Sequence, residues 1–443
     1  MTREDILDRK LDALRREVLA AGYDSLIYND FQSAMPMLRK TELYSIFKEM
    51  PKAWLCHAHF EASFDPDFSL DLAFASDDVY ISPAPGEFGW KIAYRQAFEG
   101  CTAPAGWTRL KDAAAARPEL RAQIKRSIIT TLEDISPRIW PRFEEIFITL
   151  RNINCYRPHL IKVFTKAFED MAAEGIQGVD YRFICQDIFD EDGHHYSPEE
   201  TMSVYFEIEK EVRRKYPWFT IRFVYSSYKG FDREAIAREI AFAKRLSDAF
   251  PGRIAGFDMV GCEDCGRDLN YYGPLLTGAP VPIIMHAGES VDPANHNLEQ
   301  ALELGLPRIG HGLNLYRYPA ALEEFRKRGV MLEVCPLSNQ LLGYTPDLRL
   351  HPAKDYIRKG LNVTINSDDC GVFGASYLTD DLLAAYLCWN LSLPEMKRCL
   401  INSLSVAGAG KAEQFGLMWD EFLSVTLRFG SRPVSPQNCC YRP

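Results

Sequence analysis

The sequence predicts an α/β fold, a (β/α)8 TIM barrel in which eight parallel strands alternate with helices. Apolar, β-branched runs recur along the chain, and each is followed by Gly or polar residues and then by a longer helical pattern. From the second run onward the runs start about 20 to 40 residues apart, which is close to the length of one βα unit. The eight runs cover residues 53–57, 178–184, 219–226, 255–261, 282–287, 307–311, 330–335 and 361–367.

The chain before the first run is expected to be helical. An apolar face recurs there at helical spacing, in Ile6, Leu7, Leu11, Leu14 and Val18. We therefore expect an N-terminal helical arm over residues 1–50, which could pack on a partner.

An insertion is expected after the first strand. About 120 residues separate the first two runs, far more than one βα connection needs, and residues 76–107 are rich in Pro, Gly and Asp. We place the barrel at residues 51–430, with the insertion at about 66–140. Residues 431–443 lack periodicity and are expected to form a C-terminal tail.

The composition is that of a globular protein. The 443 residues are 47% apolar and 25% charged, which excludes disordered, collagen-like and coiled-coil chains. The net charge of −10 disfavours nucleic acid and anionic lipid as partners. No apolar run is long enough to span a membrane, and the first 22 residues are charged where a signal peptide needs an apolar core. We expect a cytoplasmic protein with no membrane contact.

The 12 cysteines are too sparse for a disulfide scaffold, and most stand singly in apolar runs. We expect reduced thiols that pack as small apolar side chains. Cys262 and Cys265 form a lone CxxC pair, which we interpret as ordinary loop cysteines, with a second zinc site or a redox site as the alternatives.

Candidate metal ligands stand at the carboxyl ends of the predicted strands. His57 and His59 are two residues apart, so on an extended chain their side chains point to the same side. His286 ends the fifth run and Asp368 follows the eighth. In a barrel these ends open onto one face. Three imidazoles and a carboxylate suit Zn²⁺ and leave room for a water.

Three more residues near these ends could act on a metal-bound water. Glu289 lies three residues after His286 and could donate a proton, while His311 and Asp369 could hold or deprotonate the water or hold a substrate ring. Single members have simpler explanations: His286 could support a turn, Asp368 could cap a helix, and Glu289 could be an acid at a helix start.

The motifs that carry these residues resemble the adenosine deaminase family of metal-dependent barrel hydrolases. MPKAWLCHAH (50–59), HAGES, RIGHG, VCPLSNQ and INSDD occur in the order and spacing of that family. FEEIFITL (143–150), AGFDMVGCED (255–264) and CPLSNQLLGYTPDLRLHP (335–352) resemble most the adenosine deaminase-related growth factor branch. The similarity covers nearly the whole chain.

The resemblance implies a role for each residue. It implies that one Zn²⁺ is bound by His57, His59, His286 and Asp368. It also implies that Glu289 protonates purine N1, that His311 orients or deprotonates the attacking water, that Asp369 contacts the water and N7, and that the Gly288 backbone approaches the ring. The family further suggests a homodimer through the arm.

The sugar-binding positions depart from the family pattern. The family commonly has an Asp soon after the HxH pair, and here Glu61 is the nearest acid. Asp180 stands where a family Glu is expected near the end of the second strand, and Cys262 replaces a His of the growth factor branch. We expect Glu61, Asp180 and Cys262 to border the substrate.

Together these features predict a zinc aminohydrolase that converts adenosine, or a closely related 6-aminopurine nucleoside, to the 6-oxopurine and ammonia. The alternatives are a deaminase of adenine, of a nucleotide or of a modified adenosine. From another class, the chain could be a non-catalytic binding or signalling protein that retains the barrel.

Overall fold

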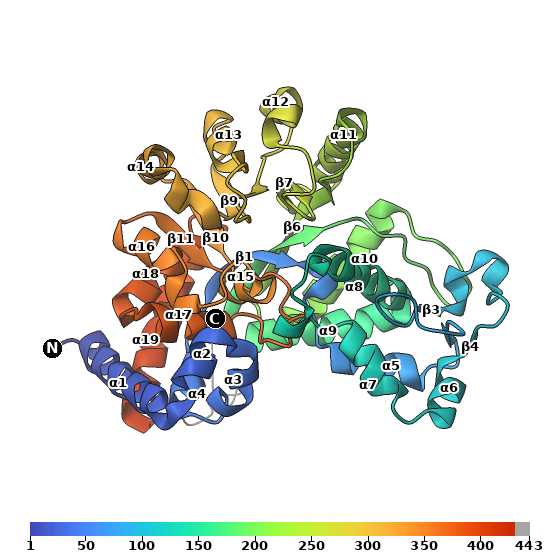
Figure 1. The fold of residues 1–443 in the computed structure, drawn as a ribbon, viewed down its shortest axis with the longest axis horizontal. Helices are drawn as coiled ribbons and strands as arrows, with labels where there is room; N and C mark the ends of the chain where they lie inside the picture. The colour runs from blue at the N-terminus through green and yellow to red at the C-terminus, as the bar shows by residue number, and fades with distance from the viewer. Residues whose placement is uncertain (430–443) are drawn as a thin grey trace.

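The computed structural model describes residues 1–429, and a ring of eight parallel strands lies at its centre (Figure 1). Each of the eight strands of this ring overlaps one of the eight predicted runs, so the predicted fold class is confirmed. The strands are β1 (Ala53–His59), β5 (Ile176–Phe183), β6 (Thr220–Tyr228), β7 (Ile254–Val260), β8 (Met285–Ala287), β9 (Arg308–His311), β10 (Met331–Val334) and β11 (Asn362–Ile365).

The strands form two parallel sheets that meet at two seams. One sheet has the order β1-β5-β6-β7 and the other the order β8-β9-β10-β11. A parallel bridge between Phe257 and Ile283 joins β7 to the segment that enters β8, and a second bridge between Ala58 and Asp368 joins β1 to the residues after β11. These bridges close the ring, so the barrel has no free sheet edge.

Helices follow the strands and cover the outside of the ring (Figure 1). The connection after β10 contains two helices, and so does the chain that follows β11 before the last helix. The covering helices are α9 (Arg157–Ala173), α10 (Pro198–Val212), α11 (Arg233–Ala249), α12 (Leu269–Thr277), α13 (Asn297–Glu303), α14 (Pro319–Arg328), α16 (Ala353–Arg358), α17 (Thr379–Trp389), α18 (Leu393–Ser403) and α19 (Lys411–Phe429), whereas the short α15 (Pro336–Leu341) is buried near the middle of the view of Figure 1.

Local sequence signals explain where these helices begin and which face they bury. Helix α10 begins with a capping box, in which Ser197 and Glu200 each accept a hydrogen bond from the backbone N–H of the other, and Pro198 occupies the first turn. Helix α11 buries one apolar stripe at helical spacing, formed by Ile236, Ile240, Ala243 and Leu246.

The N-terminal arm packs on the C-terminal helices of its own chain. It consists of α1 (Arg3–Val18), a short π-helical segment (Leu19–Tyr23), α2 (Asp24–Asn29), α3 (Phe31–Leu38) and α4 (Glu42–Glu49). Helix α1 contacts α18 and α19, and α2 and α4 contact α17. Leu7, Leu11 and Val18 are buried, whereas Ile6 is 40% exposed. The chain itself therefore covers the buried apolar face of the arm.

The segment between β1 and α9 contains a small subdomain. Its three short strands form an antiparallel sheet in the order β3-β2-β4, and Figure 1 shows this part at the right, beside the barrel. The elements are α5 (Pro66–Ala75), β2 (Val79–Ile81), β3 (Ile92–Tyr94), β4 (Thr108–Arg109), α6 (Leu110–Ala116), α7 (Leu120–Ser127) and α8 (Ile139–Asn154). Single turns of 3-10 helix occur at Phe60–Ala62, Arg95–Ala97, Glu99–Cys101, Leu132–Asp134, Leu313–Arg317 and Leu348–Leu350.

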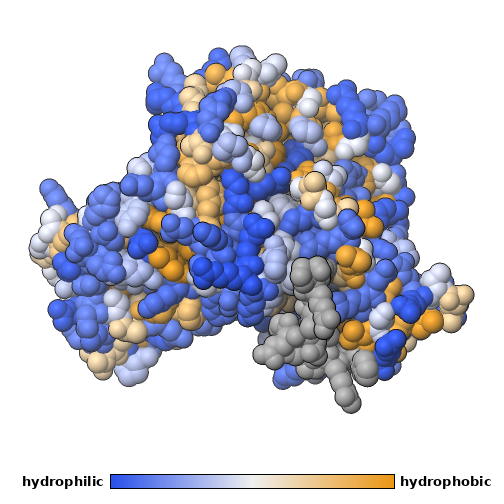
Figure 2. Space-filling model, turned by 180° about the vertical axis from the view of Figure 1, so that it is seen from behind, coloured by the Kyte–Doolittle hydropathy of each residue, from blue (hydrophilic) through white to orange (hydrophobic). Residues whose placement is uncertain are grey.

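The outer surface shows no extended apolar face on the side opposite to the view of Figure 1. Hydrophilic side chains dominate there, and the apolar areas form separate patches (Figure 2). Among residues 1–429, no helix has the length and hydrophobicity needed to cross a membrane. The tail predicted over residues 431–443 lies outside the described residues.

Candidate metal centre and active site

Four predicted ligands meet at the carboxyl ends of the strands. His57 and His59 lie on β1, His286 lies on β8, and Asp368 follows β11; one donor atom of each lies within 4.8 Å of the others. The Nε2 atoms of His57 and His59 are 3.3 and 3.2 Å from Oδ1 of Asp368. Three imidazole nitrogens and one carboxylate oxygen form a donor set that fits Zn²⁺.

Buried polar atoms without a partner support this assignment. Five such atoms belong to the predicted metal and catalytic residues, although nearly all buried polar atoms in proteins form hydrogen bonds. Within the described part of the chain, no hydrogen-bond partner is found for His57 Nε2, His311 Nε2, Glu289 Oε1, Asp368 Oδ1 or Asp369 Oδ1. Unsatisfied donors and acceptors that gather at one place indicate a site for a metal ion and a polar ligand.

A second set of donors includes His57, Asp368, His311 and Cys335. Burial raises the pKa of the Cys335 thiol well above its usual value, which disfavours the thiolate form that binds a metal. In contrast, His57 and His59 hold the pKa of Asp368 well below its usual value, although burial opposes this. The set that contains His59 and His286 therefore fits a metal better.

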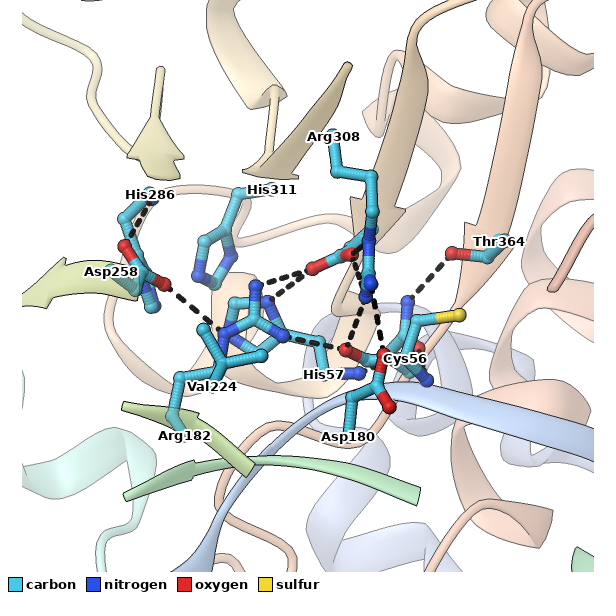
Figure 3. Close-up of polar contacts among 12 residues, drawn as sticks. Cys56, His57, Asp180, Arg182, Val224, Asp258, His286, Arg308, His311 and Thr364 are labelled. Carbon is cyan, nitrogen blue, oxygen red and sulfur yellow. Dashed lines mark hydrogen bonds and ion pairs between the residues drawn. The ribbon is translucent and has the colours of Figure 1, made fainter. Parts of the chain in front are cut away.

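Carboxylates behind the histidines orient the imidazole rings. Nδ1 of His286 is 2.7 Å from Asp258 and Nδ1 of His57 is 3.2 Å from Glu333, which leaves both Nε2 atoms facing the cluster (Figure 3). Burial lowers the pKa of His286 to about 4, which favours the neutral, ligating form.

Two buried arginines neutralise these carboxylates. Arg182 on β5 pairs with Asp258 (Figure 3). Arg182 also pairs with Glu333, and so does Arg308 on β9. Although burial opposes it, the two guanidinium groups hold the pKa of Glu333 well below its usual value. These support residues were not predicted, although Arg308 begins the RIGHG motif and Asp258 lies within AGFDMVGCED, because neither motif reveals which side chains meet inside the barrel.

Asp180 belongs to this interior network and does not border the cavity, which corrects our expectation for it. Its carboxylate accepts hydrogen bonds from Arg222, Arg308 and Trp54 at 2.9, 2.8 and 3.1 Å. Strand β5 continues for three residues beyond Asp180, to Phe183, so this side chain lies below the mouth of the barrel.

Glu289 lies buried beside the ligand cluster. Its carboxyl group is 3.6 Å from Nε2 of His311. Burial, reinforced by the charge of Asp368, raises the pKa of Glu289 well above its usual value. Burial and Asp368 raise the pKa of Asp369 in the same way. A carboxyl group that keeps its proton near neutral pH can act as a general acid.

A chain of hydrogen bonds fixes the tautomer of His311. The N–H of Ala353 donates to Nδ1 of His351, so Nε2 of His351 carries the proton and donates to Oδ1 of Asn339. Nδ2 of Asn339 then donates to Nδ1 of His311 at 3.3 Å. His311 therefore carries its proton on Nε2, the atom that faces the site, and acts there as a hydrogen-bond donor.

Two site residues have a backbone conformation that is rare outside glycine. His311 has a φ of 63° and Asp368 a φ of 57°. Such strained positions concentrate at functional sites, because the surrounding structure must hold them. The left-handed conformation turns both side chains away from the strand direction and toward the ligand cluster.

A cavity of about 250 Å³ opens onto the cluster. His59, His286, Glu289, Asp368 and Asp369 line its floor. One wall is apolar and comes from α8, through Trp140, Phe143, Phe147 and Ile148. The segment between β1 and α9 thus supplies one side of the pocket, which is suited to a flat, largely apolar ring.

The remaining predicted substrate residues have different positions. Glu61 lines the cavity and accepts a hydrogen bond from the N–H of Ile184, and burial raises its pKa. Gly288 has a φ of 76°, and a Cβ there would lie 2.5 Å from Leu298. Cys262 is not among the cavity-lining residues. It forms a disulfide bond with Cys265, which corrects our interpretation of both as reduced loop cysteines.

Glu263 is a site residue that the sequence analysis missed. Its carboxylate accepts the backbone N–H groups of Gly288 and Glu289 at 2.9 and 2.8 Å. The acid follows the run that forms β7, so its position at a strand end was the available signal.

A barrel with this donor set and a protonated acid beside it defines the class of metal-dependent barrel hydrolases. The model of the adenosine deaminase family matches residues 95–418, and the chain belongs to this family. The predicted family membership is confirmed.

Relatives and solved structures agree with this result. Adenosine deaminase 2-A of Danio rerio is 27% identical over 96% of this chain and 90% of its own length. The adenine deaminase of Arthrobacter aurescens has a similar fold, with a TM-score of 0.62 and 19% identity over 85% of this chain and 99% of its own. An amidohydrolase from Burkhoderia ambifaria with bound Zn has a TM-score of 0.62 and 16% identity over 86% of this chain and 95% of its own.

Proposed function

We propose that this protein is a zinc-dependent aminohydrolase that converts adenosine, or a closely related 6-aminopurine nucleoside, to the 6-oxopurine and ammonia. One Zn²⁺ per chain would be held by His57, His59, His286 and Asp368. The observation that carries the proposal is the buried carboxyl group of Glu289, whose pKa is raised by burial, beside this four-ligand cluster. Hydrolytic deamination of a purine needs a nucleophilic water and an acid for the ring nitrogen at the same place.

Three side chains near the ligand cluster would each have a separate role in the reaction. When bound, Zn²⁺ supplies the Lewis acidity that makes a water nucleophilic near neutral pH. Glu289 donates its proton to purine N1 as the water oxygen adds to C6. His311 orients the water through the proton on Nε2, and Asp369 contacts the water and N7. One proton of the water passes to the amine and the other restores the carboxyl group of Glu289, so that the C6–N bond breaks and the amine leaves as ammonia.

The shape of the cavity supports a purine as substrate. The aromatic side chains of α8 offer an apolar surface to the ring, and His59, Glu289 and Asp369 line the same cavity with polar groups. A purely binding protein would not require a protonated acid, a donor at His311 Nε2 and a metal-ligand set together, so we prefer an enzyme to a non-catalytic binding or signalling protein.

The charge of the cavity favours a nucleoside over a nucleotide. Acids outnumber Lys and Arg in its lining, and among the described residues Arg151 is the only cavity-lining Lys or Arg outside the interior network of Arg182. A phosphate group usually needs more basic surroundings. AMP, adenine and N6-modified adenosines are the competing substrates, so they belong in the test.

Purified protein should contain about one Zn per chain and release ammonia from adenosine, with the change in ultraviolet absorbance that accompanies formation of inosine. The same assay with adenine, AMP and N6-methyladenosine ranks the substrates. Full metal occupancy without turnover of any aminopurine would overturn the proposal. The cytoplasmic location and a homodimer remain predictions from the sequence.

A further inference from the structure

The loop after β7 carries a disulfide bond close to the proton donor. Cys262 and Cys265 are joined, and their Cα atoms are 5.2 Å apart. Cys262 is only 6% exposed, whereas Cys265 lies at the surface. Cys265 is thus open to a reagent in solution, while Cys262 is buried.

The two residues between the cysteines hold the loop that carries Glu289. Glu263 accepts the N–H groups of Gly288 and Glu289, and Asp264 accepts the hydroxyl of Ser290 at 2.7 Å. Three consecutive residues of the catalytic loop are therefore anchored to one four-residue segment, and the disulfide closes that segment into a ring.

The anchor depends on the charge of Glu263. Its carboxylate is buried, and it also accepts hydrogen bonds from the side-chain amides of Asn295 and Asn297. Although burial opposes it, Lys229 and these donors lower the pKa of Glu263. A charged acceptor with several donors around it has little freedom to move while its own backbone is held.

We propose that Cys262–Cys265 is a thiol–disulfide modification site that controls the position of Glu289. The inference rests on the proposed function. A thiolate of a small dithiol attacks the exposed Sγ of Cys265, the Cys265–Cys262 bond breaks, and Sγ of Cys262 leaves as a thiolate that takes up a proton. The second thiol of the reagent then displaces Cys265. Two electrons pass from the dithiol to the protein, which ends with two thiols while the reagent becomes a disulfide.

Reduction of the disulfide should lower kcat more than it lowers zinc affinity, because different contacts hold the metal ligands and the loop that carries Glu289. The ligands lie on β1, on β8 and after β11, and Asp258 separately holds His286. Opening the ring frees the backbone of Glu263 and Asp264, so the N–H groups of Gly288 and Glu289 lose a fixed acceptor. A small displacement of the proton donor lowers kcat by roughly ten- to a hundredfold.

The test compares the zinc-loaded full-length protein before and after treatment with dithiothreitol, which is then removed under argon. Thiols are titrated in denaturant, zinc is measured, and kcat and KM for adenosine are determined. Reduction should add two thiols and lower kcat by roughly ten- to a hundredfold, with zinc and KM unchanged. Reoxidation should restore kcat.

The double variant Cys262→Ser/Cys265→Ser should have the low kcat of the reduced protein and not respond to dithiothreitol. Cys101→Ser, which changes a partly exposed cysteine of the insertion, should behave like the wild type. A reduced protein that retains its full kcat, or a double variant that still responds, would overturn the inference.

Hydrogen exchange of the Gly288 and Glu289 amides provides a readout that needs no turnover. Both amides should exchange faster after reduction and in the double variant, but not in Cys101→Ser. If no aminopurine is deaminated but reduction speeds hydrogen exchange of these amides, the proposed function fails, whereas the control of the Glu289 loop by the disulfide is supported. If adenosine is deaminated and exchange is unchanged, the control site fails alone.

Discussion

The side-chain amide of Asn339 donates a hydrogen bond from Nδ2 to Nδ1 of His311, at 3.3 Å. This bond assigns the remaining proton of His311 to Nε2 and gives the histidine the role of a donor in the site. The family resemblance left open whether His311 orients the attacking water or deprotonates it. The bond favours orientation, because a neutral imidazole with a proton on Nε2 cannot accept another proton there.

Replacing Asn339 should therefore impair turnover without loss of metal. In Asn339→Asp the carboxylate accepts from Nδ1–H of His311, which reverses the tautomer and leaves Nε2 as an acceptor. We expect kcat to fall by roughly ten- to a hundredfold at unchanged zinc content. His351→Gln keeps a donor toward Asn339 and should be mild, whereas His351→Ala should be as severe as Asn339→Asp. Wild-type kcat in all three variants would contradict the role.

Glu289→Gln should leave the metal bound and abolish most turnover. The amide keeps the size of the side chain but cannot supply a proton to the ring, so kcat should fall by roughly a hundred- to ten-thousandfold. Glu144→Gln is a suitable control, because Glu144 lines the same cavity on α8 but lies outside the ligand set. Similar rates for the two variants would show that the acid is wrongly assigned.

The raised pKa of Glu289 predicts a pH dependence of kcat. The protonated form is active, and burial keeps the proton bound above the pH at which an exposed carboxyl group loses it. Turnover of adenosine should be high at neutral pH and decline as the pH rises through the raised pKa. The residual activity of Glu289→Gln should lack this decline. A wild-type profile that stays flat on the alkaline side would argue against a protonated acid.

Glu333→Gln should weaken zinc binding although Glu333 is not a ligand. The carboxylate holds Nδ1 of His57 and balances Arg182 and Arg308, so its neutral analogue loosens the ring and leaves buried positive charge. We expect a tenfold to hundredfold loss of affinity, roughly, in competition with a chromogenic chelator. Glu299→Gln, at an exposed carboxylate on α13, should leave the affinity unchanged.

Buried His159 should make the fold sensitive to acid. Its ring contacts Ser69 and Tyr94, and burial lowers its pKa to about 3. Because the folded pKa lies below the unfolded value of about 6.5, the unfolded state binds more protons between these values, and stability falls as the pH drops below about 6.5. Between pH 7 and pH 5 this histidine should contribute a loss of about 1 to 2 kcal/mol.

Urea denaturation at both pH values measures this effect. His159→Gln should show a smaller difference between pH 7 and pH 5 than the wild type, and the exposed His194→Gln should match the wild type. An equal pH dependence in all three proteins would mean that another group causes the loss.

The sequence was most informative where an apolar run typical of a strand ends in a His or Asp that could bind a metal. The eight runs predicted the eight strands, and the His and Asp residues at their ends predicted a shared site, because parallel strands of a barrel end on one face. Asp180 was misplaced because an apolar run does not reveal how far a strand continues. Glu263 and Asn339 act through contacts with residues distant in the sequence, and no local pattern encodes such contacts.

The disulfide was missed for a related reason. A CxxC spacing is compatible with free thiols, a metal site or a bond, and only the fold of the loop brings Cys262 and Cys265 together. An amphipathic helix shows that one face is covered without showing what covers it, and in the arm the chain's own helices α18 and α19 contact α1.

The bridge between Ala58 and Asp368 has a consequence for how the molecule is assembled. The backbone N–H of His59 donates to the carbonyl of Asp368, and the backbone N–H of Asp368 donates to the carbonyl of His57. The residues predicted to bind the metal therefore also form the backbone hydrogen bonds that close the ring between its first and last strands. During synthesis His57 and His59 emerge some 300 residues before Asp368 does. The nascent chain cannot complete its metal site until the ring closes, so loading with the ion reports that the barrel is finished.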